Sequence, residues 1–137
     1  MLVFFSRSLV TVAVLLLSVV ILYSAESGTS APVAKVIPLA ASGENYVSVL
    51  GGPPESVNMR SGLVLLSPGK SVGKHSTGQN EELLIFLEGA GEMTFKNGSK
   101  LPVKGNSALY CPPETEHNVT NTGSGLLRYV YVVSKAR

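Results

Sequence analysis

After residue 45 the chain alternates between short apolar runs and turn sequences that are rich in glycine and proline. The runs contain many β-branched and aromatic residues and none has a helical period, which is the pattern of β-strands. The strands that this pattern predicts are Tyr46–Leu50, Met59–Leu66, Leu83–Leu87, Glu92–Lys96, Ser107–Cys111 and Leu126–Val133. The dipeptide Asn97-Gly98 predicts a tight hairpin after the fourth of them. The sequence therefore predicts an all-β domain over residues 46–137, either a sandwich or a closed barrel.

The run Glu82–Leu87 is apolar on both faces, except for the carboxylate at its start. Alternation places its side chains in two sets, Glu82, Leu84 and Phe86 on one face and Leu83, Ile85 and Leu87 on the other. A strand of this kind needs cover on both sides. We expect the first set to line the barrel interior and the second to form the interface of a homodimer. Cover from Val33–Ile37 or Tyr46–Leu50 of the same chain is the alternative.

An apolar segment precedes this domain. Leu9–Tyr23 is interrupted only by Thr11 and Ser18, follows Arg7, and is itself followed by small residues. A basic start, a short apolar core and small residues after it are typical of a secretory signal peptide. Together with Met1–Phe5 the segment approaches the ~20 residues that cross a bilayer, so an uncleaved anchor helix is the alternative.

Under both interpretations residues 1–27 direct the rest of the chain out of the cytoplasm, because the basic end stays inside. They are also the only part that we expect to contact a membrane. Residues 28–45 are rich in Ser, Ala, Gly and Pro, and predict a linker with a short strand at Val33–Ile37.

The charge and the cysteine content of the chain exclude some classes of function. Lys and Arg number 11 against 9 acidic residues, for a net charge of +2, and no basic run stands out. This excludes the electrostatic footprint of a nucleic-acid-binding protein. Every acidic residue is Glu, so carboxylate chemistry cannot use Asp. Cys111 is the only cysteine, which excludes an intramolecular disulfide, and we expect it to be buried and inert.

The candidate chemistry lies in His75 and His117, the only histidines, and in Glu82 at the head of the apolar strand. Imidazole and carboxylate together form a donor set that suits a divalent ion of Fe, Mn, Ni, Cu or Zn.

Two motifs resemble those of the cupin family. The first family motif reads Gly, His-x-His, Glu, Gly, and its positions correspond to Gly69, His75, Thr77, Glu82 and Gly89. The second reads Gly, Pro-x-Gly-x-x-His, Asn, and corresponds to Gly105, Pro112, Glu114, His117 and Asn121. The resemblance covers roughly Met59 to Val133. It implies a double-stranded β-helix, or jelly-roll barrel, in which His75, Glu82 and His117 point inward as metal ligands.

The chain departs from the family pattern at the second histidine, which is Thr77 here, and at a motif glycine, which is Glu114. Two histidines and one carboxylate remain, the set of the facial-triad oxygenases, which leaves coordination positions open. We expect Thr77, Gln79 and Tyr110 as additional site residues, with Gln79 near the vacant position.

These observations support two hypotheses. The first is an exported cupin-domain protein that binds a divalent metal and a small organic molecule, and acts as a metal-dependent oxygenase or isomerase if it is an enzyme. The second is a non-catalytic, metal-free barrel that binds a small, sugar-like ligand. The cupin fold hosts many chemistries, so the choice depends on the site.

Overall fold

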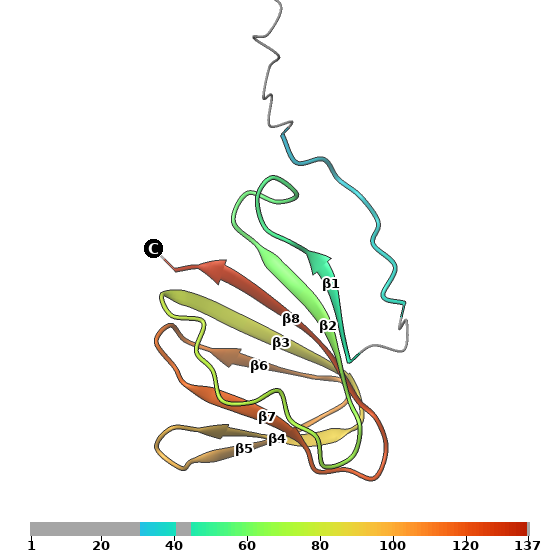
Figure 1. Ribbon diagram of the computed structural model, residues 1–137, viewed down its shortest axis with the longest axis vertical. Helices are drawn as coiled ribbons and strands as arrows, with labels where there is room; N and C mark the ends of the chain where they lie inside the picture. Colours follow the sequence, from blue (N-terminus) through green and yellow to red (C-terminus); the bar gives the residue numbers. More distant parts are fainter. Residues whose placement is uncertain (1–30, 41–44, 137) are drawn as a thin grey trace, which may run out of the picture. The chain divides into compact units, whose positions relative to one another are not determined.

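Eight β-strands account for the regular structure in the computed structural model, which describes residues 31–40 and 45–136. The strands, drawn in Figure 1, are β1 (Tyr46–Leu50), β2 (Arg60–Leu66), β3 (Asn80–Glu88), β4 (Ala90–Phe95), β5 (Lys100–Lys104), β6 (Ser107–Cys111), β7 (His117–Asn121) and β8 (Leu127–Lys135). The described residues contain no helix, so the predicted all-β class is confirmed for them.

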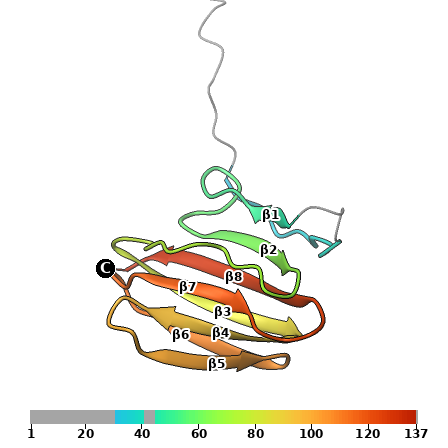
Figure 2. The same ribbon diagram turned by 60° about the horizontal axis from the view of Figure 1, so that its bottom comes forward.

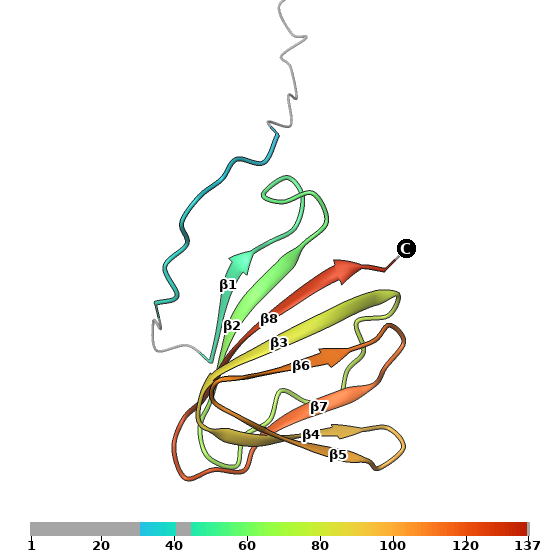
Figure 3. The same ribbon diagram turned by 180° about the vertical axis from the view of Figure 1, so that it is seen from behind.

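The strands form two antiparallel sheets. The larger has the order β1-β2-β8-β3-β6, which Figure 3 shows from behind, and the smaller has the order β5-β4-β7. From β3 onward the chain passes repeatedly from one sheet to the other, and this winding produces a double-stranded β-helix. The hairpin predicted at Asn97-Gly98 is confirmed, because it joins β4 to β5 with Gly98 at φ +83°.

The hydrophobic core lies between the two sheets. It joins Leu84 and Phe86 of β3 to Met93 of β4, Val119 of β7 and Leu127 of β8, all of them buried. Each such side chain contributes about 1.5–3 kcal/mol of transfer free energy when it leaves water. The predicted alternation in β3 is confirmed, since its inward residues are buried down to Glu82, which is only 4% exposed.

The outer face of β3 is not covered within the described chain, where Leu83 and Ile85 are 39% and 38% exposed. The strand predicted at Val33–Ile37 is wrong, because residues 31–40 form no strand and Val36 is 95% exposed. Pro32 and Pro38 bracket this run and cannot donate backbone hydrogen bonds to a sheet. The homodimer through this face stays a prediction, which light scattering would test.

Two strands of the structure, β5 and β7, were not predicted from the sequence. The β5 strand contains a proline, and β7 (His117–Asn121) is mostly polar, so neither matches an apolar alternation. The leader predicted at residues 1–27 lies outside the described residues. Among the described residues no helix has the length and apolar character that a membrane span requires.

Candidate metal centre

The two histidines meet because the segment that follows β2 runs alongside β7 (Figures 1 and 2). Backbone hydrogen bonds tie Gly69 to Asn121 and Val72 to Val119 along this segment. At its end His75 and His117 exchange two backbone hydrogen bonds of 3.0 and 2.9 Å. A directly opposed pair of this kind brings the side chains close together, and the imidazole centroids lie 4.5 Å apart.

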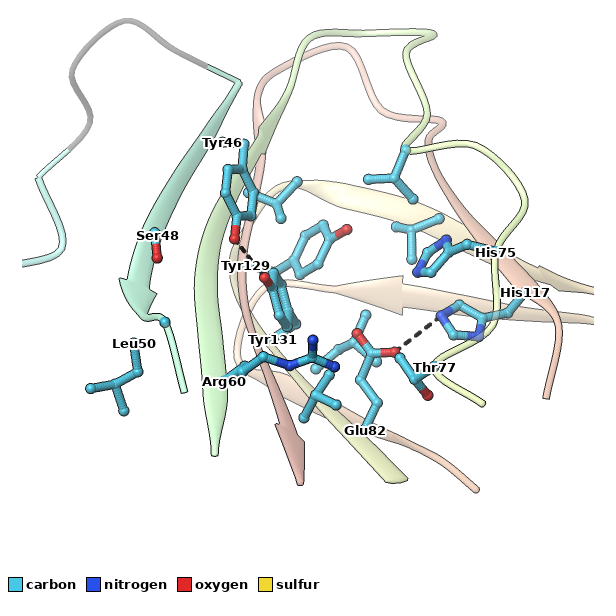
Figure 4. Close-up of a pocket in the computed structure, with 16 residues that line it drawn as sticks. Tyr46, Ser48, Leu50, Arg60, His75, Thr77, Glu82, His117, Tyr129 and Tyr131 are labelled. Carbon is cyan, nitrogen blue, oxygen red and sulfur yellow. Dashed lines mark hydrogen bonds and ion pairs between the residues drawn. The ribbon is translucent and has the colours of Figure 1, made fainter. Parts of the chain in front are cut away.

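Glu82 reaches the histidines from β3, in the opposite sheet. Its Oε2 lies 3.3 Å from Nε2 of His117, and both side chains are almost completely buried. One ligand atom from each of Glu82, His75 and His117 lies within 4.8 Å of the other two. Figure 4 shows the three side chains converging on one end of a cavity. The structure thus brings together the three residues that the sequence analysis selected as ligands.

Backbone carbonyls orient both imidazoles. Nδ1 of His117 lies 3.0 Å from the Thr115 carbonyl, and Nδ1 of His75 lies 2.9 Å from the Gly73 carbonyl. Because a carbonyl oxygen only accepts, each Nδ1 carries the proton and donates it. In the neutral imidazole the lone pair is then on Nε2, which is the usual arrangement behind a metal-binding histidine.

Glu82 and His117 fit a bound cation. Oε2 of Glu82 and Nε2 of His117 are buried and face each other at 3.3 Å. With a neutral imidazole both atoms only accept, so neither has a hydrogen-bond donor among the described residues. Burial by itself lowers the pKa of His117, but the Glu82 carboxylate and the Thr115 carbonyl outweigh it and raise the pKa above its ordinary value. Unpaired buried polar atoms are costly, and a divalent ion would satisfy both of these at once.

Cys111 lies behind the site, with its Sγ 3.2 Å from Nδ1 of His117. The prediction that this residue is buried is confirmed. Burial, followed by the charge of Glu82, raises the pKa of the thiol to about 11. The protonated thiol therefore packs against His117 rather than offering a reactive thiolate.

The expected additional site residues do not all join the ligands. Thr77 borders the cavity, but its hydroxyl donates to the Asn80 carbonyl at 3.0 Å and so stabilises a turn. Contrary to expectation, Gln79 is exposed and does not border the cavity. Tyr110 is 57% exposed because it pairs with Leu83 in the sheet and shares its outward direction. Its hydroxyl donates to Glu81.

Glu114 stands where the resembled motif has glycine, and it keeps the glycine backbone, with φ +58°. Its N–H donates to the Gly78 carbonyl at 2.7 Å, which ties the turn before β7 to the turn before β3. A left-handed conformation at a non-glycine residue costs roughly 1–2 kcal/mol. The departure from the motif therefore preserves the turn that positions His117.

The cavity beside the three ligands has a volume of about 500 Å³ and mostly apolar walls. The sequence analysis did not identify the arginine and the three tyrosines that line it, namely Arg60, Tyr46, Tyr129 and Tyr131. Alternation along Leu126–Val133 carried a signal for Tyr129 and Tyr131, since it places both on one face. Nothing in the local pattern pointed to Arg60, which reaches the cavity only because β2 pairs with β8.

The sequence and the fold were compared with known proteins. The family model of the cupin domain matches residues 62–133, more than half of the chain. Similar solved structures include a protein with a double-stranded β-helix domain from Klebsiella pneumoniae, at 16% identity and a TM-score of 0.63, covering 75% of this chain and 91% of that one. An RmlC-like cupin family protein from Methanocaldococcus jannaschii has 18% identity and a TM-score of 0.62, with 75% and 92% covered.

The Cnp3 cupin domain of Schizosaccharomyces pombe is similar at 19% identity and a TM-score of 0.60. The match covers 66% of this chain and 64% of that one, so it spans less than two thirds of that structure. No curated protein matches the chain. At these identities the likeness to solved structures concerns the fold.

Proposed function

The chain belongs to the cupin family, and we propose that it binds one divalent transition-metal ion and, in the adjoining cavity, a small organic molecule. The observation that carries the proposal is the convergence of His75, Glu82 and His117, whose ligand atoms lie within 4.8 Å of one another. The two buried atoms without a hydrogen-bond partner, one on Glu82 and one on His117, support it.

The donor set suits Fe, Mn, Ni, Cu or Zn in the divalent state. When bound, such an ion would supply Lewis-acid polarisation or oxygen chemistry at the positions that three protein ligands leave open. The chain's own residues hold the ligand atoms in place through the Thr115 and Gly73 carbonyls. The adjoining space has mostly apolar walls, against which the body of a small organic molecule would pack. The activity that we propose is metal-assisted oxygenation or isomerisation of a small organic molecule.

A second candidate function is metal-free ligand binding without catalysis. It is favoured by Thr77, which stands in place of a ligand, and by the 3.3 Å separation of His117 and Glu82. A protonated His117 at that distance forms an ion pair with the carboxylate and replaces the metal charge. In the first function a metal ion would neutralise the charge of Glu82, whereas in the second a protonated His117 would do so.

Metal analysis distinguishes these functions. We expect wild-type protein refolded with each of the five ions to retain close to one equivalent of at least one of them after dialysis. Glu82→Gln keeps the shape of the side chain but removes its charge, and should weaken binding by at least about 10-fold. Glu81→Gln is the matched control, because Glu81 bonds to Tyr110 on the outer face. Folded wild-type protein that retains none of the five ions would end the metal hypothesis.

We also propose that the protein works outside the cytoplasm. The support is the apolar run Leu9–Tyr23 behind Arg7. Residues 1–45 fused to alkaline phosphatase should give activity in the periplasm of a bacterial host, since this enzyme folds only after export. N-terminal sequencing then separates a cleaved leader from an anchor. An inactive fusion that is present at normal levels contradicts export.

A further inference from the structure

Arg60 supplies the only permanent positive charge among the residues that line the cavity. Figure 4 shows its side chain entering the cavity from β2, toward Tyr131 and the carboxylate of Glu82. The ion pairs of the described residues are Lys100 with Glu92 and His117 with Glu82, and neither involves Arg60. Arg60 is an exposed residue at the start of β2, and its guanidinium borders the cavity without a carboxylate at ion-pair distance among the described residues.

Arg60 is held by the strand and by a glycine. Its backbone is paired with Val133 of β8. A Cβ added to Gly52 would lie 3.1 Å from Cγ and 3.6 Å from Cδ of Arg60, so the alkyl stem runs closely over this glycine. Gly52 is buried and has a φ of +96°, a conformation that favours glycine. Contacts along the stem reduce the entropy that the side chain loses when it binds a ligand.

Two tyrosine hydroxyls border the same cavity as the guanidinium. The Tyr46 and Tyr131 hydroxyls are 2.6 Å apart and share a hydrogen bond, and their rings stack at 6.1 Å. Both rings cover Gly62, where a Cβ would lie 2.7 Å from one ring and 2.8 Å from the other. The glycine in β2 therefore makes room for the pair. Burial raises the pKa of Tyr131, so its hydroxyl remains a neutral donor.

Tyr129 brings a third hydroxyl to the same space. Its ring is 2% exposed and lies against Phe86 at a centroid distance of 5.1 Å. The hydroxyl end points into the cavity in Figure 4. Burial also raises the pKa of Tyr129, which keeps the hydroxyl protonated and able to donate.

From these groups we infer that the cavity binds a small organic carboxylate, held by Arg60 and the hydroxyls of Tyr129 and Tyr131, with an apolar body. The inference rests on the proposed binding of a small molecule in this cavity, and names its chemical class. A guanidinium presents parallel N–H donors that match a carboxylate, and the charge assistance strengthens both bonds. The body of the ligand would lie against Val64, Leu84, Val119 and Val133, toward the metal ligands.

The charge of Arg60 favours an anionic ligand. Arg60 is permanently charged and forms no ion pair among the described residues, so it attracts an anionic ligand to the cavity and repels a cationic one. A volume of about 500 Å³ is within the range that small-molecule sites use.

Calorimetric titration with acids and their uncharged amides tests this inference. The probes are benzoate, 3-phenylpropanoate and 4-methylpentanoate, each paired with its amide and each titrated into metal-free and metal-loaded protein. We expect at least one acid to bind about 10- to 100-fold tighter than its amide, as a charge-assisted bidentate contact provides. Arg60→Gln should remove this preference, whereas Arg60→Lys, which keeps the charge but not the fork, should retain part of it.

Arg128→Gln is the matched control, because Arg128 lies on β8 but bonds to the Leu39 carbonyl away from the cavity. It should leave the preference for the acid unchanged. The inference is overturned if no acid binds tighter than its amide, or if Arg60→Gln binds the acid as well as wild type does. Metal content measured on the same samples separates the two proposals. If the protein binds metal but does not prefer acids to their amides, only the inference of a carboxylate ligand is refuted. If the protein prefers acids through Arg60 but binds no metal, only the proposed metal site is refuted.

Discussion

His117→Ala is expected to lower the affinity for a divalent ion by at least about 100-fold while the barrel remains folded. Loss of a group that only supports a metal ligand typically costs 10–100-fold, and removal of one of three ligands should cost more. His75 and His117 are the only histidines of the sequence, so no third histidine can replace His117 as a ligand. Competition with a chelator of known affinity measures the change, and far-UV circular dichroism reports whether the β structure survives.

Asn118→Ala provides the control for this substitution. Asn118 is the next residue of β7, so its side chain points to the other face of the strand. We expect this variant to bind metal as wild type does. A protein that keeps its metal after His117→Ala would remove His117 from the ligand set.

Thr77→His should act in the opposite direction. It restores the histidine of the family motif at a residue that borders the cavity. The substitution loses the hydrogen bond from the Thr77 hydroxyl to Asn80, worth about 1 kcal/mol. A fourth ligand should more than offset this loss in the metal-bound form. In a metal-free barrel the same substitution would leave metal content negligible.

Gly89→Ala is expected to have the largest effect on stability, and should lower the free energy of unfolding by more than about 4 kcal/mol. A Cβ at this position would lie 2.2 Å from the Leu126 carbonyl oxygen and 2.7 Å from Cα of Leu127. Both contacts are with backbone, which cannot turn aside as a side chain can. The residue also has φ +83°, so alanine adds conformational strain to the clash. Urea unfolding of both proteins measures the difference.

Gly98→Ala separates the two causes. Gly98 has the same φ of +83° in the β4–β5 hairpin, but a Cβ there would meet nothing within 4 Å. Only the cost of the left-handed conformation, roughly 1–2 kcal/mol, should remain. Equal losses in the two variants would show that the close approach at Gly89 does not contribute.

The close approach of backbone segments also explains why glycine occupies the motif positions 89 and 105. Gly105 donates its N–H to the Gly89 carbonyl at 2.9 Å, and a Cβ at Gly105 would lie 2.9 Å from Cα of Glu88. The two glycines thus allow the chain to leave β3 and to enter β6 beside the same backbone. Glycine is required there by contact between segments, and not by local turn chemistry alone.

Local sequence determined much of the fold. The apolar runs and the turns between them located β1, β2, β3, β4, β6 and β8 to within three residues at either end. Alternation in β3 correctly assigned Glu82 to the interior and Leu83 to the outer face. These features depend on side-chain period and turn conformation, which neighbouring residues specify. Residue order and spacing, through the resemblance to the cupin motifs, also selected the three residues that converge in the structure.

The tertiary structure alone decided the rest. Arg60 and Tyr131 lie 71 positions apart in the numbering, and meet in one cavity only through the pairing of β2 with β8. The pairing of β3 with β6 directs Tyr110 outward, because Tyr110 lies opposite Leu83, which faces outward. The orientation of the imidazoles depends on the Thr115 and Gly73 carbonyls, whose directions follow from loop conformation. Short-range patterns identify which residues can carry chemistry, whereas strand register between distant segments determines which of them share a site.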